Sequence, residues 1–255
     1  MEFYISASTD IGTRRKVNQD SLFVRRLETR TGKMVLAVLC DGMGGLNFGE
    51  LASAAIVSAF TDWMYQDLSA LSQDPLEDHT IREQWSELIE EQNRRIRSYG
   101  QRYHCTAGST ATALLLTENR YFLLNIGDSR AYEIAEQVTQ LTEDHTVVAN
   151  EVRLGNLTKE QAEHSSIQNV LTRCVGVQEE AWPDLFFGTV QKGAVYMLCS
   201  DGFRHRLTRE EMQEHLLHAV KKEPLQMKCQ EEYLIELTKQ RGETDNISVV
   251  TIYTE

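Results

Sequence analysis

The chain has 255 residues, of which 41% are hydrophobic and 25% are charged, and this is the composition of an ordinary soluble globular protein. Its 15 glycines and 3 prolines are too few for a collagen-like, linker-rich or largely disordered chain. The 38 acidic and 26 basic residues give a net charge of −12, which argues against general nucleic-acid binding because phosphate groups would repel the chain.

The first part of the chain is expected to form strands and then two helices. β-Rich segments separated by turns and charges predict strands over residues 4–9, 21–27 and 34–40. A helix is expected over 49–68, because apolar residues such as Ile56 and Phe60 fall on one helical face. A second, longer helix follows, and Thr80 with Glu83 is expected to form its capping box.

Strands return in the second part of the chain. They are expected over residues 109–116, 120–126, 130–134, 138–141, 184–190, 194–200 and 247–253. The stretch 146–170 is polar with one short helix after Thr158, and helices are expected over 208–220 and 224–241. Because strands and helices come in runs, the order indicates an α+β fold with two antiparallel sheets packed together and helices outside. No linker or repeat divides residues 1–255, which predicts a single domain.

Five aspartates stand at the ends of apolar strands. Asp41 and Asp201 each follow an apolar run directly and precede a glycine, and Asp128 follows a third apolar run after one glycine. Asp20 and Asp245 stand just before two further apolar runs. One Asp-Gly pair at a strand end is usually only a turn, but its repetition at three strongly apolar strands indicates a shared function.

The positions of these aspartates point to bound cations. Burying ionised carboxylates together is unfavourable unless something compensates, and only Arg130 and Arg204 lie near the strand ends. Divalent cations that prefer oxygen ligands are the natural alternative, and Gly42 would let a backbone carbonyl approach one closely. Two such ions would activate water for a displacement at phosphorus, with Arg14 or Arg15 as a fork for the phosphate oxygens.

Six short motifs occur in one order along the chain. They are Gly12-Thr13-Arg14-Arg15-Lys16-Val17-Asn18-Gln19-Asp20, Asp41-Gly42-Met43-Gly44-Gly45, Gly127-Asp128-Ser129-Arg130-Ala131-Tyr132, Leu141-Thr142-Glu143-Asp144-His145, Ser200-Asp201-Gly202 and Asp245-Asn246. This series resembles the metal-dependent serine/threonine protein phosphatases of the PPM (type 2C) family in their compact bacterial form. The resemblance covers almost the whole chain and implies the family's four-layer αββα sandwich.

The resemblance implies ligands for two Mn²⁺ or Mg²⁺ ions in the active site. Asp41 would bridge the two ions, and the carbonyl of Gly42 would be a further ligand. Asp201 and Asp245 would complete the other metal. Asp128, together with Asp201, matches a weaker third metal position of bacterial members.

The resemblance also implies roles around the metals. Asp20 would lie among the metal ligands or just behind them and would orient a metal-bound water. Arg15 matches the arginine that contacts phosphate. The segment 146–170 matches the mobile flap beside the site, which is expected to contribute to substrate choice.

Three positions depart from the family pattern. Gln19 stands where many relatives have glutamate, so one negative charge near the metals is absent. Met43 and Leu46 stand where relatives place histidines, and the histidine at the Met43 position is a proposed general acid. Protonation of the leaving group is therefore unassigned, and His145 is interpreted as a structural loop residue in preference to a general acid.

These features favour a serine/threonine protein phosphatase that acts on phosphoproteins and opposes a Ser/Thr protein kinase. Two alternatives stay open: a catalytically weak phosphoprotein-binding adaptor on the same fold, and a phosphatase of an anti-sigma-factor antagonist. Five scattered cysteines without a CxxC pair, and the lack of a basic apolar leader or a membrane-length apolar run, predict a cytoplasmic protein. We expect a monomer that binds neither nucleic acid nor membrane.

Overall fold

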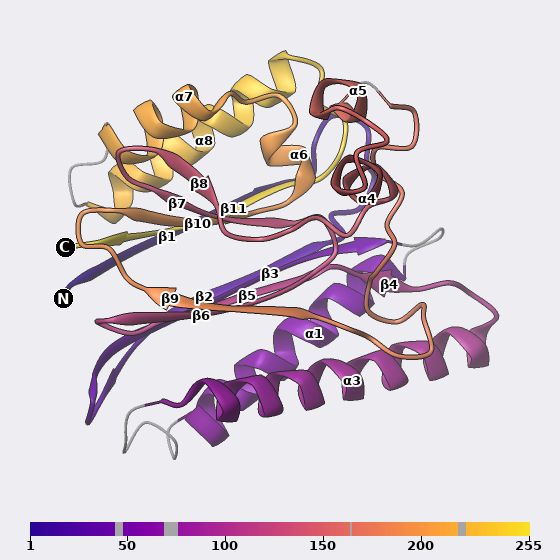
Figure 1. Ribbon diagram of the computed structural model, residues 1–255, viewed down its shortest axis with the longest axis horizontal. Helices are drawn as coiled ribbons and strands as arrows, with labels where there is room; N and C mark the ends of the chain where they lie inside the picture. Colours follow the sequence, from indigo (N-terminus) through magenta and orange to yellow (C-terminus); the bar gives the residue numbers. More distant parts are fainter. Residues whose placement is uncertain (44–47, 69–75, 164, 219–222) are drawn as a thin grey trace.

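Two antiparallel sheets lie face to face, and helices cover the outer face of each sheet (Figure 1). The computed structural model describes residues 1–43, 48–68, 76–163, 165–218 and 223–255. Its layers run helix, sheet, sheet, helix, so the expected α+β fold and αββα sandwich are confirmed.

The two sheets differ in size and bring together strands that are distant in sequence. One has the order β1-β11-β10-β7-β8, and the other has the path β2-β3-β5-β6-β9, with β4 paired to β3. The strands are β1 (Phe3–Asp10), β2 (Asp20–Thr29), β3 (Gly32–Met43), β4 (Gly108–Ser109), β5 (Ala111–Leu116), β6 (Arg120–Ile126), β7 (Arg130–Ile134), β8 (Val138–Gln140), β9 (Asp184–Thr189), β10 (Val195–Cys199) and β11 (Ile247–Thr254). The first and last strands are neighbours, with Phe3 opposite Thr254.

The helices divide between the two outer faces and one end of the sandwich. They are α1 (Gly49–Trp63) with the π-helical turn η1 (Met64–Leu68), α3 (Asp78–Tyr103), α4 (Val147–Arg153), α5 (Lys159–Glu163), α6 (Asp201–Arg204), α7 (Arg209–Gln213) with the π-helical turn η2 (Glu214–His218), and α8 (Pro224–Gln240). In Figure 1, α1 and α3 lie under one sheet, α7 and α8 lie over the other, and α4 and α5 stand beside α6. Within the described residues, no helix has both the length and the apolar character needed to cross a membrane.

β3 shows how the apolar sequence builds the layers. Because successive side chains of a strand point to opposite faces, Leu36, Val38 and Cys40 pack toward α1 and α3, whereas Val35 and Leu39 pack toward the other sheet. β3 is therefore buried on both faces, which explains its continuous apolar run. Its last residues emerge from the core at one end of the sandwich, where Asp41 and Gly42 lie.

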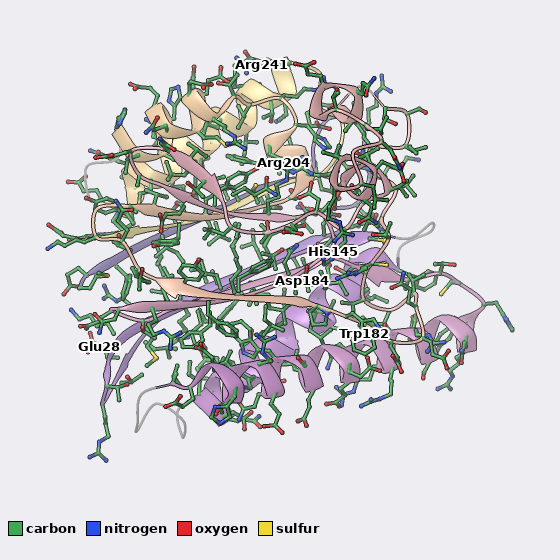
Figure 2. All side chains as sticks on the ribbon, in the orientation of Figure 1. Glu28, His145, Trp182, Asp184, Arg204 and Arg241 are labelled. Carbon is green, nitrogen blue, oxygen red and sulfur yellow. The ribbon has the colours of Figure 1, made fainter. Side chains whose placement is uncertain are left out.

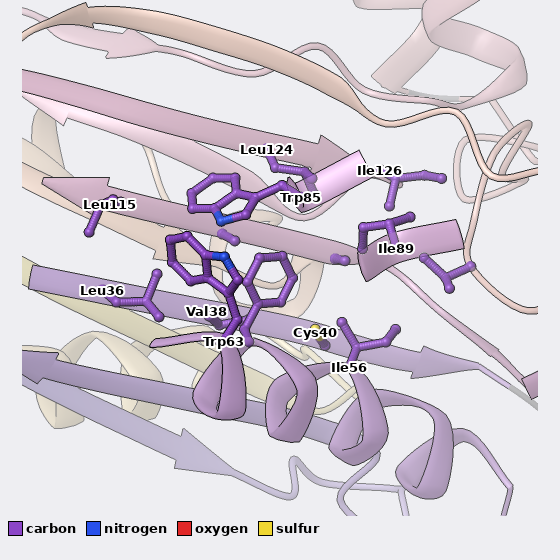
Figure 3. Packing of buried hydrophobic residues seen from close by; sticks show 14 of the residues in the cluster. Leu36, Val38, Cys40, Ile56, Trp63, Trp85, Ile89, Leu115, Leu124 and Ile126 are labelled. Atoms are coloured by element: carbon purple, nitrogen blue, oxygen red, sulfur yellow. The ribbon is translucent and has the colours of Figure 1, made fainter. Parts of the chain in front are cut away.

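Aromatic side chains anchor the two helices that cover the six-stranded sheet. Trp85 of α3 meets Trp63 and Phe60 of α1, in both cases with ring centroids 5.5 Å apart and the rings nearly perpendicular (Figure 3). This edge-to-face geometry stabilises aromatic pairs beyond the burial of their area. A third apolar cluster, which includes Met197, Phe203 and Leu234, fills the space between the five-stranded sheet and α6 to α8.

Two local predictions about helices are wrong. The helix expected to be capped by Thr80 and Glu83 begins earlier, at Asp78, and Thr80 lies inside its first turn. Asp78 pairs with Arg120 of β6 at 2.7 Å, a contact across the fold that the local pattern does not reveal. The sequence also missed α4, whose N-cap Thr146 accepts a hydrogen bond from the backbone N–H of Ala149 at 3.1 Å.

The other helix signals are located correctly. Thr158 and Gln161 form reciprocal capping hydrogen bonds before α5, and Thr208 forms a full capping box with Glu211. The helix expected over 208–220 is seen to His218, and its expected end lies outside the described residues. Pro224 occupies the first turn of α8, where its missing N–H leaves no intrahelical hydrogen bond unmade.

Candidate metal centre

The structure brings the five predicted aspartates to one end of the sandwich. Asp20 and Asp41 are directly opposite each other in the pairing of β2 with β3. Asp201 begins α6 immediately after β10, Asp128 lies in the turn between β6 and β7, and Asp245 lies just before β11. Each of the other four carboxylates raises the pKa of Asp41 by electrostatic repulsion, so the five form one cluster.

Asp41 is at the centre of this carboxylate cluster. Its pKa is raised well above the usual value, first by burial and then by repulsion, to which Asp20 contributes most. Its backbone is fixed on both sides: the Asp41 N–H donates to Oγ1 of Thr110 at 2.8 Å, and the Asp41 carbonyl accepts from the Thr110 N–H at 2.9 Å. The Ser109 hydroxyl also donates to that carbonyl, at 3.0 Å. The Asp41 side chain is thus held in place by its own main chain.

Asp20 and Asp201 carry buried carboxylate oxygens without a hydrogen-bond partner in the described part of the chain. Both oxygens of Asp20 and Oδ1 of Asp201 are buried and have no hydrogen-bond partner among the described residues. Burial raises the pKa of Asp20 to about 7, although the nearby hydroxyls of Ser248 and Ser200 favour its ionised form. Burial also raises the pKa of Asp201. Buried, unsatisfied carboxylate oxygens require a compensating partner such as a cation.

Asp128 and Asp201 each lie beside a basic residue of the α6 region, Arg204 and His205 respectively. Burial, followed by repulsion from Asp201, raises the pKa of Asp128 to about 7. Arg204 opposes this shift, since its Nη2 lies 3.9 Å from Oδ2 of Asp128 and donates to the Asp128 carbonyl at 3.2 Å. His205 lies 3.9 Å from Oδ2 of Asp201. Arg204 and His205 therefore provide partial compensation on the α6 side of the cluster.

Asp245 is held by the arginine that the sequence assigns to phosphate. Arg15 donates from Nε to Oδ1 of Asp245 at 2.7 Å and from Nη2 to Oδ2 at 2.5 Å, which is a bidentate pair. This hydrogen bonding raises the pKa of Arg15 further, and the charges of Asp41 and Asp201 contribute to the shift. The guanidinium thus faces the carboxylate cluster, as a phosphate-binding group beside metal ions should.

Gly42 lies where only glycine fits. A Cβ at this position would lie 2.2 Å from the carbonyl oxygen of Gly49 and 2.6 Å from that of Gln19. The Gly42 N–H donates to the same Gln19 carbonyl at 3.1 Å. Because both neighbours are backbone atoms, a side chain would displace the end of β3 that carries Asp41.

Several supporting residues were not predicted. Asn246 accepts from the Gln19 N–H at 2.9 Å and donates to the carbonyl oxygens of Ile11 and Val17, so it secures both ends of the loop that carries Arg15. Its place beside Asp245 in the sixth motif was the available signal. Glu243 accepts from the N–H of Asp245 at 3.0 Å, in a local turn that none of the six motifs includes.

His145 is a structural residue, as the sequence interpretation preferred. Its Nδ1 accepts from the N–H of Gly127 at 3.1 Å, so its Nε2 carries the proton and donates to Oδ2 of Asp184 at 2.9 Å (Figure 2). Burial lowers the pKa of His145. With both ring nitrogens engaged, His145 fixes the turn that carries Asp128. Met43 ends β3 opposite Gly108, and Leu46 lies outside the described residues.

The donor set fits hard divalent cations. Carboxylates that repel one another, with unpartnered oxygens on Asp20 and Asp201, match the oxygen ligands that Mg²⁺ and Mn²⁺ prefer. Within the described ranges, no three acidic, histidine or cysteine side chains lie close enough to coordinate one metal ion in their present conformations. Asp245 is turned to Arg15 in this arrangement. Ion binding therefore requires small side-chain adjustments within a backbone that already places the groups together.

Comparisons with known proteins identify the family of the chain. Residues 12–232 match the family model described as protein phosphatase 2C. The chain is 31% identical to protein phosphatase PhpP of Streptococcus pneumoniae over 253 residues, which is 97% of this chain and 96% of that protein. The solved S. agalactiae serine/threonine phosphatase superposes with a TM-score of 0.85 at 30% identity, with 100% of both chains covered. The catalytic domain of the serine/threonine protein phosphatase PstP, in complex with two manganese ions, superposes with a TM-score of 0.79 at 28% identity over 99% of both chains.

The αββα sandwich, its terminal carboxylate cluster and these similarities define a metal-dependent serine/threonine protein phosphatase. The chain belongs to the protein phosphatase 2C family.

Proposed function

We propose that this protein removes phosphate from phosphoserine and phosphothreonine in proteins by using two divalent metal ions, Mn²⁺ or Mg²⁺. The observation that carries the proposal is the cluster of five aspartates, with buried oxygens on Asp20 and Asp201 that no group in the described part of the chain satisfies. A relative solved with two manganese ions supports both the kind of metal and the number.

We assign the metal ligands residue by residue. Asp41 and the Gly42 carbonyl would hold the two ions, and Asp201 and Asp245 would complete the set. Asp128 with Asp201, whose charges repel each other, would hold a third, weaker ion. When bound, the ions supply an activated water and neutralise the charge that develops on the phosphoryl oxygens.

The remaining polar groups position water and substrate. Asp20 orients the attacking water through carboxylate oxygens that accept no hydrogen bond from described groups. Arg15 exchanges its bidentate contact with Asp245 for the phosphate oxygens, because a guanidinium presents the same fork to either anion. Asn246 keeps Arg15 within reach by holding the loop on both sides. No side chain is assigned as general acid, because His145 is fully engaged.

The wider organisation follows the same proposal. Residues 1–255 act as one catalytic domain, and the 146–170 segment is the flap beside the site. We propose a cytoplasmic monomer whose partners are phosphoproteins and the Ser/Thr kinase that modifies them. The acidic net charge of −12 supports protein partners over nucleic acid or anionic membrane surfaces.

Metal-dependent turnover tests the function. Purified protein stripped with chelator should be inactive on a phosphothreonine peptide and on p-nitrophenyl phosphate, and Mn²⁺ should restore both activities. Asp41→Asn should lower turnover at least about 100-fold, since changes even behind the ligands of metal sites cost 10- to 100-fold. Asp62→Asn, the same change on an exposed residue of α1, is the matched control and should leave turnover unchanged.

Three outcomes would each overturn a part of this proposal. Full activity in excess chelator would exclude the metal chemistry, and full activity of Asp41→Asn would exclude the ligand assignment. Tight binding of the phosphopeptide without any metal-stimulated turnover would establish an adaptor on this fold.

A further inference from the structure

A groove of about 1200 Å³ opens beside the carboxylate cluster. One wall is α4 in the 146–170 segment, the opposite wall is α6 with its connection to α7, and the β7–β8 hairpin contributes to the lining. Figure 1 shows α4 and α6 side by side at this end of the molecule. Arg204, which is labelled in Figure 2, lines the groove, and its Nη2 lies 3.9 Å from Oδ2 of Asp128, so this arginine links the groove to the carboxylate cluster.

The charge of this groove is opposite to that of the whole chain. Six arginines line it: Arg130, Arg153, Arg173, Arg204, Arg206 and Arg209. Among the residues that the structure describes, its acidic lining residues are Glu143, Asp144 and Asp184. In a protein of net charge −12, this concentration of guanidinium groups is a local reversal of sign. We call this surface, lined by those six arginines, the basic groove.

The arginines at the inner end are already paired. Arg130 holds Asp144 by two short contacts, at 2.8 and 2.6 Å, and Arg173 lies 3.0 Å from Asp184. Two of the three carboxylates named in the lining are therefore neutralised by ion pairs. These pairs connect Asp144 and Arg173, which flank the 146–170 segment, to the first residues of β7 and β9, and they leave little negative charge in the groove.

The arginines at the outer end keep their charge available. Arg153, Arg206 and Arg209 are exposed, and no carboxylate forms an ion pair with any of them in the part of the chain that the structure describes. Within the described part of the chain, the guanidinium of Arg153 donates to the side chain of Asn150, and that of Arg209 donates to the Val138 carbonyl at 3.3 Å. These three exposed arginines come from both walls of the groove.

We propose that the basic groove binds an acidic segment of the phosphoprotein substrate, next to its phosphorylated residue. This inference rests on the proposed phosphatase function and names the class of sequence that the enzyme prefers: phosphoserine or phosphothreonine flanked by Asp and Glu. Arg153, Arg206 and Arg209 bind the flanking carboxylates while the phosphate lies at the metal centre. A peptide is favoured over nucleic acid because the surrounding acidic surface repels a long polyanion but not a short acidic segment.

The test compares three substrates and two double variants. The substrates are a phosphothreonine peptide with acidic flanks, the same peptide with the acids replaced by Asn and Gln, and p-nitrophenyl phosphate. At low ionic strength the wild type should have a kcat/KM about tenfold higher on the acidic than on the neutral peptide. The variant Arg206→Glu with Arg209→Glu should abolish this preference without changing p-nitrophenyl phosphate hydrolysis. Salt should reduce the wild-type preference.

A charge-matched control separates the groove from the overall field. Arg94→Glu with Arg95→Glu makes the same change in net charge on α3, where both arginines are exposed, and should keep the preference. Equal kcat/KM on the acidic and neutral peptides in the wild type would overturn the inference. A loss that is equal for both double variants would also overturn it.

Binding measurements keep this inference separate from the phosphatase function. If the wild type with Mn²⁺ fails to hydrolyse p-nitrophenyl phosphate, the proposed function fails. The groove is then judged by fluorescence anisotropy of a labelled, unphosphorylated acidic peptide, which should bind at least about tenfold tighter than its neutral counterpart. Tighter binding of a single-stranded oligonucleotide of equal charge would contradict the assignment to acidic peptides.

Discussion

Single residues decide where the charge of the site lies. Asp20 and Asp41 face each other across a strand pair, which is unfavourable for two carboxylates. Burial is the main cause that raises the pKa of each, and repulsion from Asp20 raises the pKa of Asp41 further. The fold tolerates this repulsion because the strands that carry these residues are fixed by the core and by Thr110. Repulsive, unsatisfied groups held by a stable scaffold are typical of a functional site.

Gly42 offers a test at this scale. Gly42→Ala should lower the free energy of unfolding by about 1–3 kcal/mol, because its Cβ would overlap the Gly49 and Gln19 carbonyl oxygens and shift the end of β3. Metal-dependent turnover should fall more than stability explains, because Asp41 moves with that strand end. Denaturant unfolding and turnover on p-nitrophenyl phosphate measure the two effects.

Gly193→Ala is the control for the Gly42 variant. Gly193 has φ of 79° and open space around it, so alanine there strains the backbone without a clash. This control should lose about 1–2 kcal/mol of stability and keep its turnover. If Gly42→Ala keeps full turnover, the close packing at Gly42 does not position the site.

At the scale of elements, α8 is attached to the sheet through a buried carboxylate. Glu231 is fully buried and accepts hydrogen bonds from the hydroxyls of Ser6 and Ser8 on β1 and of Thr251 on β11, at 2.6 to 2.8 Å. Burial raises its pKa to about 7, against the opposing hydrogen bonds and the charge of Lys228. The helix therefore depends on the protonation state of one side chain.

Glu231→Gln tests this attachment. A folded-state pKa above the unfolded value means that Glu231 favours the fold below its unfolded pKa, and that this stabilisation is lost as pH rises through 7. The variant should therefore gain stability relative to wild type between pH 5 and pH 8, by up to about 3 kcal/mol. Urea unfolding of metal-free protein at each pH measures this, and the difference isolates Glu231 because the site aspartates titrate in both proteins. A pH-independent difference would refute the account.

Most elements could be predicted from the sequence because their patterns are local. The continuous apolar run of β3 follows from its burial on both faces, and the apolar face of α1 follows from its burial on one face. The start of α3 and the presence of α4 could not be predicted in this way. Asp78 is fixed by Arg120 of β6, in the sheet that α3 covers, and α4 is too short for an apolar period to emerge.

At the scale of the whole molecule, the clustering of the aspartates could be predicted from the sequence. The residues that hold them in place by hydrogen bonds could not. Five carboxylates at strand ends meet because β2, β3, β10 and β11 all present the relevant end to the same edge of the sandwich. Which groups hold them depends on pairings between distant segments, such as Asn246 with the loop before Asp20. The basic groove could not be predicted from the sequence for the same reason, since its arginines come from separate elements.

Negative and positive charge are concentrated in two neighbouring places on the molecule. The acidic excess is concentrated in part at the metal centre, and the basic groove adjoins it through Arg204. A substrate with a phosphate and acidic flanks meets complementary charge at both places once the ions are bound. Both the proposed activity and this complementarity depend on the binding of divalent metal by the carboxylate cluster.

Isothermal titration of Mn²⁺ into chelator-stripped protein tests this claim most directly. The account predicts two tightly bound equivalents per wild-type chain, and at least about tenfold weaker binding or loss of an equivalent in Asp41→Asn. Asp62→Asn should titrate like the wild type. A wild type that binds no Mn²⁺, or an Asp41→Asn variant that binds two equivalents with unchanged affinity, would contradict the account.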